Sequence, residues 1–462
     1  MKQIHLLIGI FLFFLIYFLG GTDNQFYNAI ALGALVVYWW ISEPIPLYVT
    51  ALVPIIVGPI LGLVSIAELE SSYGNKMVFL FLGGFLIALA IEKWDLHKKI
   101  AFMIIQRTGS SPAGVLLGFI LSTAFLSMWL SNTGTTIMML PMTMTVLKSL
   151  PLNNEKFTEK FSIALLLGVA FAASIGGTAT LVGSPPNIQM AGILEQNYHI
   201  KVDFMTWTSI GLPFSICMLT ILFFYLKWRF INKADNHIQI QVENHRGTTK
   251  NQQRILLIFL FTIVMWSVKQ FINEAFHWKI SDTEIALFGA LLLFIIPSNE
   301  NKKEGILVWE DTKELPWGIL ILFGGGLALA SILSNGGVLK AFAHWIETTH
   351  FSSYFILVMA LVIVSILLTE LMSNLALVTV LIPIVAELGQ TMGYSILSLC
   401  IPVTLAASCA FMLPMSTPPN AIVFASGRIK VKTMAKVGSV LNLVSILVIG
   451  AFAYIISIFF PL

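Results

Sequence analysis

Residues 131–141 read SNTGTTIMMLP, and residues 373–383 read SNLALVTVLIP. In each copy a proline follows ten residues after the serine of a Ser-Asn pair, within an otherwise apolar stretch. A second pair of motifs lies downstream, GSPPN at residues 183–187 and STPPN at residues 416–420. The first pair is 242 residues apart and the second 233, about half of a 462-residue chain. The sequence therefore indicates an internal duplication.

A third pair, FLGG at residues 81–84 and LFGG at residues 322–325, is 241 residues apart and lies upstream of each Ser-Asn pair. All three pairs sit in a chain that is 57% hydrophobic and only 11% charged, with a mean hydropathy of +0.88. Soluble globular domains carry roughly 25% charged residues. Repeated apolar runs of about 20 residues are typical of helices that span a bilayer. We therefore predict an all-α polytopic membrane protein.

We predict about 11 transmembrane helices and two re-entrant helical hairpins. The hairpins are residues 112–149 and 353–394, because each apolar stretch is interrupted midway by a Ser-Asn motif. Irregular backbone at the hairpin tips cannot face lipid, so the tips must be buried in protein or line a wet cavity. The predicted spans are residues 4–20, 28–42, 46–66, 75–92, 160–196, 205–226, 253–272, 283–297, 316–335, 396–426 and 433–460.

These elements divide into a first transmembrane helix within residues 1–27, a repeat over residues 28–226, a cytoplasmic linker over residues 227–252 and a second repeat over residues 253–462. Each repeat holds five spans and a hairpin, and an odd number of spans inverts the second repeat relative to the first. One hairpin then enters from the cytoplasm and the other from outside, so that their tips can meet. Inverted repeats with interrupted helices are how many secondary transporters build a midplane site.

The basic residues give the orientation. This layout places 21 of the 26 Lys and Arg residues on one side, which the positive-inside rule makes cytoplasmic. We therefore predict a multi-pass protein of the plasma (inner) membrane, with its N-terminus in the cytoplasm and its C-terminus outside. The five basic residues predicted outside are Lys76, Lys201, Lys269, Lys279 and Lys340.

The hairpin tips carry the polar chemistry. Ser and Thr hydroxyls and Asn amide oxygens are neutral ligands suited to a small hard cation, and the same groups can donate to an anion. A helix that starts just after the tip adds backbone N–H groups and the positive end of its dipole. The Pro-Pro pairs break the spans 160–196 and 396–426, because proline lacks an N–H and clashes with a continuing helix. Unwound segments leave carbonyl oxygens free for cations.

Ionisable residues at membrane depth are few. Glu370 lies four residues before Asn374, and either a proton site or a structural hydrogen bond would explain it. Glu43 follows a Trp-Trp pair. The three cysteines and eight histidines are not spaced as metal ligands or as a nucleophile with its base, so we expect neither a metalloenzyme nor an intramembrane enzyme. A channel is also disfavoured, because interrupted inverted repeats suit an alternating site.

On these motifs the whole chain resembles the divalent anion:sodium symporters, the INDY-like family of dicarboxylate, citrate and sulfate carriers. The resemblance implies a homodimer with a scaffold domain and a mobile transport domain that work by an elevator motion. It also implies sodium-coupled uptake of a C4 dicarboxylate such as succinate. The implied partners are Na⁺, a small dianion, the lipid bilayer and a second copy of the chain, with no nucleic acid.

The resemblance also carries over site residues. The sodium ligands it implies are Ser127, Ser131, Asn132 and Gly183 at one site, and Thr369, Met372, Asn374 and Ser416 at the other. The substrate ligands it implies are Asn132, Thr133, Ser184, Asn374, Thr417 and Pro418. The chain departs from the family at Leu375, where a Ser-Asn-Thr motif would place a hydroxyl donor. Which dianion is preferred therefore stays open.

Three other transport functions stay open at this point. A sodium-independent dianion exchanger would use the same hairpins with weakened cation sites. A carrier of sulfate or citrate would differ only in the anion. A Na⁺/H⁺ antiporter would need a titrating carboxylate at the site, and Glu370 is the candidate placed for it.

Overall fold

The computed structural model describes residues 2–21, 24–150, 155–231, 247–347 and 353–459. In these ranges the regular elements are helices, apart from one isolated β-bridge between Pro297 and Gly305. The prediction of an all-α fold is confirmed. The predicted linker 227–252 lies mostly outside the described residues, and its two ends belong to helices.

The helices of the first half of the chain run from α1 to α12, which ends just before residue 231. Their bounds are α1 Lys2–Gly20, α2 Gln25–Ser42, α3 Leu47–Thr50, α4 Val53–Ile60, α5 Ile66–Tyr73, α6 Lys76–Lys93, α7 Leu96–Arg107, α8 Pro112–Ser127, α9 Asn132–Lys148, α10 Glu155–Gly177, α11 Pro185–Tyr198 and α12 Phe204–Phe230. The second half repeats much of this order. Its bounds are α13 Lys250–Phe276, α14 Asp282–Ile295, the 3₁₀ helix η2 Trp309–Glu314, α15 Trp317–Asn335, α16 Val338–Glu347, α17 Tyr354–Thr369, α18 Asn374–Met392, α19 Ile396–Ala407, α20 Pro418–Phe424 and α21 Val431–Phe459.

Both predicted hairpins form as two helices joined by a short turn, α8 with α9 and α17 with α18. In each, the serine of the Ser-Asn motif caps the returning helix. The Ser131 Oγ accepts the Gly134 N–H at 3.0 Å, and the Ser373 Oγ accepts the Ala376 N–H at 3.2 Å. Such a cap satisfies one of the free N–H groups of a helix start, which explains why the chain turns at these positions.

The two Pro-Pro motifs interrupt their spans as predicted. The first span consists of α10 and α11, separated by residues 178–184, and the second consists of α19 and α20, separated by residues 408–417. The asparagine of each motif braces the unwound segment that precedes it. The Asn187 Nδ2 donates to the carbonyls of residues 177 and 180, and the Asn420 Nδ2 to those of residues 410 and 413, at 2.8–3.1 Å.

The structure corrects the prediction of one span over residues 46–66. The chain there forms the short helices α3 and α4 and enters α5 at its end. Pro46 precedes α3 and Pro54 lies in the first turn of α4. Proline provides no N–H donor and clashes with the preceding turn, and here the helix is interrupted just ahead of Pro54, at residues 51–52.

The structure also adds a pair of helices that the sequence analysis did not predict. Helix α7 begins at Leu96 and α16 begins at Val338, which is again 242 residues later. Each links a glycine-rich helix, α6 or α15, to the following hairpin. Both helices carry charged or polar residues among their apolar ones, so neither reads as a membrane span.

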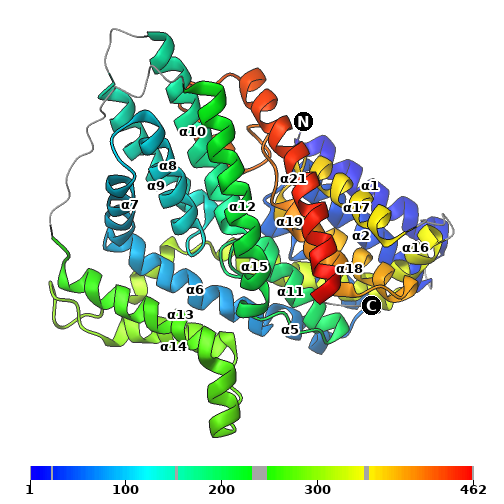
Figure 1. Ribbon diagram of the computed structural model, residues 1–462. Helices are drawn as coiled ribbons and strands as arrows, with labels where there is room; N and C mark the ends of the chain where they lie inside the picture. Colours follow the sequence, from blue (N-terminus) through cyan, green and yellow to red (C-terminus); the bar gives the residue numbers. More distant parts are fainter. Residues whose placement is uncertain (1, 22–23, 151–154, 232–246, 348–352, 460–462) are drawn as a thin grey trace.

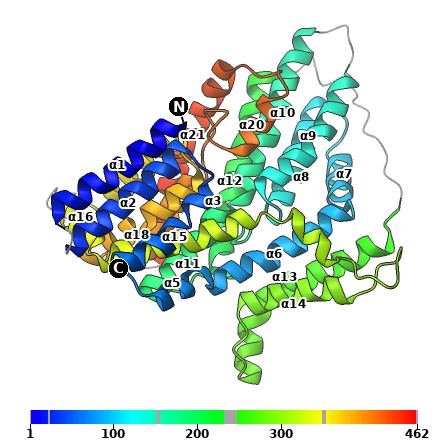
Figure 2. The same cartoon turned by 180° about the vertical axis from the view of Figure 1, so that it is seen from behind.

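The two repeats interlock through their interrupted helices. Helix α20 of the second repeat packs against α9 and α10 of the first, and α11 of the first packs against α18 of the second (Figures 1 and 2). The Phe171 and Phe411 rings meet edge to face at the junction, with their centroids 5.1 Å apart. The hairpin and the interrupted helix of different repeats therefore share one core.

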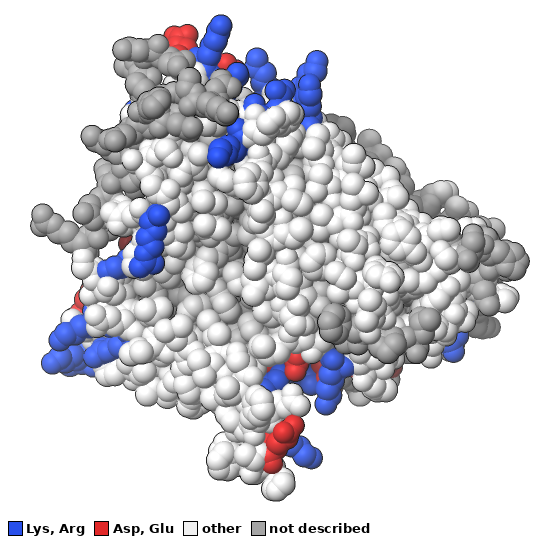
Figure 3. Space-filling view, viewed as in Figure 1, with Lys and Arg blue, Asp and Glu red and all other residues white. Residues whose placement is uncertain are grey.

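Eight helices of the described residues are long and apolar enough to cross a membrane. Figure 3 shows a broad face without charged side chains, with Lys, Arg, Asp and Glu gathered at its edges. Large apolar side chains such as Phe11, Phe224 and Leu447 are at least 60% exposed. A polytopic membrane protein explains this surface, because lipid solvates it.

Adjacent glycines of the first glycine motif allow a test of the packing of α6 on α14. A β-carbon at Gly83 would lie 2.8 Å from the Cβ and carbonyl carbon of Ala286, whereas one at Gly84 would lie 3.9 Å from Val182. We expect Gly83→Ala to destabilise the protein by about 1–3 kcal/mol through overpacking. We expect Gly84→Ala to be neutral or stabilising by up to about 1 kcal/mol, since alanine favours helix. Apparent melting temperatures in detergent that fall equally for both variants would contradict this packing.

Candidate functional site

The first hairpin tip brings three oxygen atoms together. Ser127 ends α8 and is fully buried, while Asn132 begins α9. The Ser127 Oγ lies 2.7 Å from both the Asn132 Oδ1 and the Ala173 carbonyl O of α10. The single hydroxyl hydrogen can serve only one of these acceptors at a time. The tip and the interrupted helix therefore meet at a cluster of neutral oxygens.

The second hairpin repeats this geometry with a threonine in place of the serine. The Thr369 Oγ1 lies 2.8 Å from the Asn374 Oδ1 and 2.6 Å from the Ala407 carbonyl O of α19. Thr369 and Asn374 stand 242 residues after Ser127 and Asn132. Three equivalent atoms in two copies are difficult to explain as an accident of packing.

Backbone carbonyls converge on the first unwound segment. The carbonyl oxygens of Gly177, Met128 and Ser127 lie 2.7–3.0 Å from the point that a β-carbon at Gly183 would occupy. A β-carbon at Gly177 would collide with the Asn132 side chain. Both glycines therefore keep open a space that is lined by neutral oxygens, the ligand type that a small hard cation prefers.

The sequence-predicted residues fall into two environments. Ser184, Ser416 and Thr417 lie in or at the ends of the unwound segments, and each is at most 5% exposed. The tip residues are half-buried, and Pro418 at the start of α20 is exposed. The half-buried tip residues are Ser131, Asn132, Thr133, Met372 and Asn374. A ligand could therefore reach the tips from solvent while it contacts a buried polar wall.

Leu375 does not stand in the environment that we expected for a residue of the dianion site. Its side chain is 7% exposed and belongs to a hydrophobic cluster with Leu32 of α2, Leu329 and Leu333. Thr133, the equivalent residue of the first tip, is half-buried. The missing hydroxyl at position 375 therefore has a packing reason: this tip meets an apolar part of α15 and α2.

Glu370 has a structural role. Its Oε1 accepts the N–H groups of Phe411 and Met412 and the Asn442 amide, and its Oε2 accepts the Leu413 N–H, all at 2.8–3.0 Å. The carboxylate thus satisfies three backbone donors of the second unwound segment. This geometry favours the structural reading of Glu370 over the proton site. Glu43, the other carboxylate that the sequence analysis noted, is exposed at the C-terminal end of α2.

One carboxylate at the first tip was missed. Glu92 lies at the end of α6, where the predicted span ends, and its Oε1 lies 3.1 Å from the point that a β-carbon at Gly134 would occupy. Its position near a span end hid it, because carboxylates are common there.

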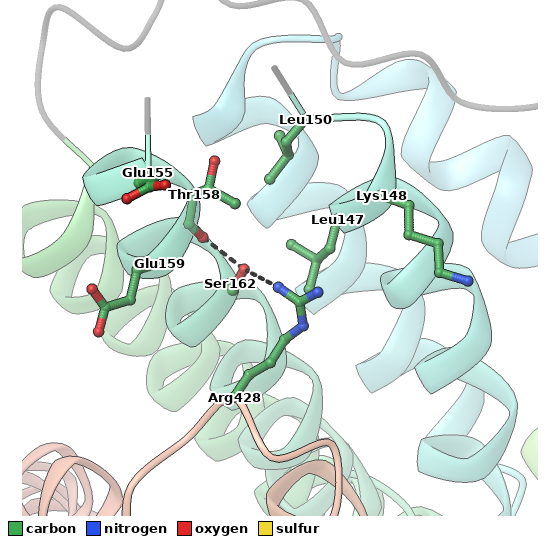
Figure 4. Close-up of a pocket in the computed structure, with 8 residues that line it drawn as sticks. All are labelled: Leu147, Lys148, Leu150, Glu155, Thr158, Glu159, Ser162 and Arg428. Atoms are coloured by element: carbon green, nitrogen blue, oxygen red, sulfur yellow. Dashed lines mark hydrogen bonds between the residues drawn. The ribbon is translucent and has the colours of Figure 1, made fainter. Parts of the chain in front are cut away.

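A surface pocket lies apart from both tips. It is lined by the end of α9, the start of α10 and the loop after α20, and its residues are labelled in Figure 4. The Arg428 side chain points toward Ser162, and its Nη1 donates to the Ser162 Oγ at 3.4 Å (Figure 4). None of the sequence-predicted site residues lines this pocket. Within the described ranges, no group of three or more His, Cys, Asp or Glu side chains could hold a metal ion.

Comparison with known proteins adds to this geometry. Residues 1–459 match the family model described as the transmembrane region of sodium:sulfate symporters. The chain is 36% identical to the sodium-dependent dicarboxylate transporter SdcS of Staphylococcus saprophyticus, over 98% of this chain and 91% of that protein. It is 37% identical to the SdcS of Staphylococcus aureus strain USA300, over 90% of this chain and 83% of that protein.

A solved structure shares the fold. The crystal structure of the Alcanivorax borkumensis YdaH transporter matches with a TM-score of 0.56 at 12% sequence identity, over 84% of this chain and 87% of that one. At this identity the match supports the fold alone.

The role of Glu370 predicts a stability effect. Glu370→Gln replaces one acceptor oxygen by an NH₂ group that faces backbone N–H donors, so we expect a loss of about 1–3 kcal/mol. Glu387→Gln is the matched control, because Glu387 is about as buried as Glu370 but accepts a hydrogen bond from a side chain, the Tyr198 hydroxyl at 3.3 Å. Melting in detergent measures both. A Glu370→Gln protein that melts like the parent and shows a flattened pH dependence of transport would restore the proton-site reading.

Proposed function

The chain belongs to the sodium:sulfate symporter family, and on that premise we propose that it couples the entry of Na⁺ to the uptake of a C4 dicarboxylate such as succinate. It is a multi-pass membrane transporter and not an enzyme. The SdcS relatives are named as sodium-dependent dicarboxylate transporters, which favours a dicarboxylate over sulfate or citrate as the substrate.

One observation carries the proposal. A hydroxyl, an asparagine amide oxygen and a backbone carbonyl meet at each hairpin tip in the same arrangement, at Ser127, Asn132 and Ala173 and again at Thr369, Asn374 and Ala407. Neutral oxygens of this kind suit Na⁺, whereas Mg²⁺ is usually bound through carboxylates. The donor set therefore fits one sodium ion at each tip.

We assign the sodium ligands as the resemblance implied them. Ser131 and Asn132 would act together with carbonyls at Ser127 and Gly183, and the carbonyls that converge beside Gly183 support this site. Thr369 and Asn374 would act together with carbonyls around Met372 and Ser416. In both cases the hairpin tip and the unwound segment each contribute part of the shell.

The dianion would bind between the tips and the starts of α11 and α20. Asn132, Thr133, Asn374, Ser184 and Thr417 would provide neutral donors, and Pro418 a surface contact. Four helices, α9, α11, α18 and α20, begin at these motifs. Their N-terminal N–H groups and dipoles favour negative charge. Because the described tips contain no Arg or Lys, bound sodium would supply the remaining positive charge, which couples the two ligands.

We also propose the orientation and the assembly that the sequence and the resemblance imply. The N-terminus would be cytoplasmic, the C-terminus outside, and two copies would form a homodimer. The two hairpins, the interrupted helices, α12 and α21 would form a transport domain that moves against a scaffold of the remaining helices. Ion pairs cross this boundary: Lys76 of α6 pairs with Glu195 of α11 at 2.5 Å, and Lys269 of α13 pairs with Asp203 ahead of α12 at 3.0 Å. An elevator motion would have to break them.

The alternatives have less support. A sodium-independent exchanger would be expected to lose the coordinating Ser or Asn of the motifs, and neither tip has lost them. A Na⁺/H⁺ antiporter would need Glu370 to titrate at the site, but that carboxylate accepts four hydrogen bonds, three from the second unwound segment and one from Asn442.

Truncation of the tip asparagines tests the proposal. Asn132→Ala and Asn374→Ala each remove an amide that would contact charged ligands, worth about 1.5–3 kcal/mol. We therefore expect sodium-dependent succinate binding to weaken roughly ten- to hundred-fold, measured by equilibrium binding to purified protein. Asn301→Ala is the matched control, because Asn301 is exposed in a loop. Parental affinity in both tip variants would refute the site assignment.

A further inference from the structure

The Glu92 carboxylate faces the first turn of α9. A β-carbon at Gly134 would lie 3.1 Å from the Glu92 Oε1 and 3.0 Å from the Ser131 Oγ, so the carboxylate and the capping hydroxyl flank the same glycine. In the part of the chain that the structure describes, Glu92 has no ion pair, and no hydrogen bond to its carboxylate is present.

The neighbours of Glu92 are paired, which sets it apart. Lys93 pairs with Asp311 at 2.6 Å, and Asp95 pairs with Lys98 at 2.6 Å. Glu92 is half-buried, like the tip that it faces. A partly buried carboxylate without a hydrogen-bond or ion-pair partner is costly. The fold therefore keeps a negative charge at this tip without a structural partner for it.

The second repeat has an apolar residue at the position equivalent to Glu92. Leu333 of α15 stands 241 residues after Glu92, the same offset as the glycine motifs, and Ala376 stands 242 residues after Gly134. Leu333, Leu375 and Ala376 all belong to one buried hydrophobic cluster. The second tip thus packs against a leucine where the first tip meets a glutamate. The equivalent contact can be made by an apolar side chain.

The Glu92 carboxylate and a bound dianion would both lie at the N-terminal end of α9. The start of α9 attracts negative charge through its free N–H groups and its dipole, and Glu92 already provides such a charge beside it. A dianion that binds at Asn132 and Thr133 would be repelled by Glu92, with a Coulomb energy that rises with the product of the charges. The repulsion would be least while sodium ions are bound nearby and greatest after they leave.

We propose that Glu92 is an affinity-determining residue of the dianion site, whose negative charge weakens dianion binding in this conformation and so promotes release. This inference rests on the proposed function. Glu370, the carboxylate of the second tip, differs because it accepts four hydrogen bonds. The dianion affinity would therefore fall wherever the first hairpin lies next to α6. A conformation that separates the two would bind the dianion more tightly. A lower affinity in the releasing conformation shortens the time for which the dianion stays bound there.

Neutralisation of Glu92 tests this proposal. We expect Glu92→Gln to lower the dissociation constant for succinate at least about tenfold, and Glu92→Leu, the residue of the second repeat, to do the same. Net uptake by proteoliposomes should slow, because release is slower. Glu310→Gln is the matched control. Glu310 is exposed and stands next to Asp311, the partner of Lys93. Its substitution removes one negative charge near α6 but none at the tip.

The ligand charge separates electrostatics from a structural change. Monomethyl succinate carries half the charge of succinate. The logarithm of its dissociation constant should therefore change about half as much between the parent and Glu92→Gln as that of succinate does. Equal gains for both ligands, or a dissociation constant that stays unchanged or rises in Glu92→Gln, would overturn the proposal. Succinate binding by the parent protein in the presence of sodium tests the proposed function separately. If the parent protein binds no succinate, the proposed function is wrong and this inference is wrong with it. If the parent binds and only the Glu92 effect is missing, the inference alone is wrong.

Discussion

The structure depends on one constraint: backbone groups that leave a helix inside an apolar protein must find partners within it. Two segments, residues 178–184 and 408–417, leave their helices in this way. Asn187 and Asn420 bind the carbonyls of these segments, and Glu370 binds the N–H groups of the second. Two of the three carbonyls beside Gly183 are held in this way, that of Gly177 by Asn187 and that of Met128 by the Thr180 hydroxyl. A fixed position of such oxygens favours selective binding of a small cation.

Much of this arrangement was readable from the sequence because it rests on residues with strong local rules. Paired prolines must interrupt a helix, and serine before a helix start caps it, so the hairpins and breaks were predicted close to their observed positions. The helices α7 and α16 were missed because amphipathic segments lack the long apolar run of a span. Residues 46–66 were misread because several prolines matter more there than mean hydropathy does.

The residue types of the site could be predicted from the sequence, but the different surroundings of the two hairpin tips could not. Asn132 and Asn374 follow from their motifs, whereas the contacts of Glu92 with Gly134 and of Leu375 with its hydrophobic cluster join residues about 40 or more positions apart. Such contacts depend on how the repeats pack, which no local pattern records. The two tips are therefore alike in their oxygen clusters and different in what the neighbouring glycine-rich helix places beside them: Glu92 of α6 at the first, and leucines of α15 at the second.

The most direct test of the account is uptake of radiolabelled succinate by proteoliposomes that contain the purified protein, with and without an inward Na⁺ gradient. The account predicts that the gradient drives succinate above its outside concentration and that collapse of the gradient releases it. Exchange of succinate against preloaded dianion that proceeds equally well without Na⁺ would contradict the coupling of sodium and dianion at the paired tips.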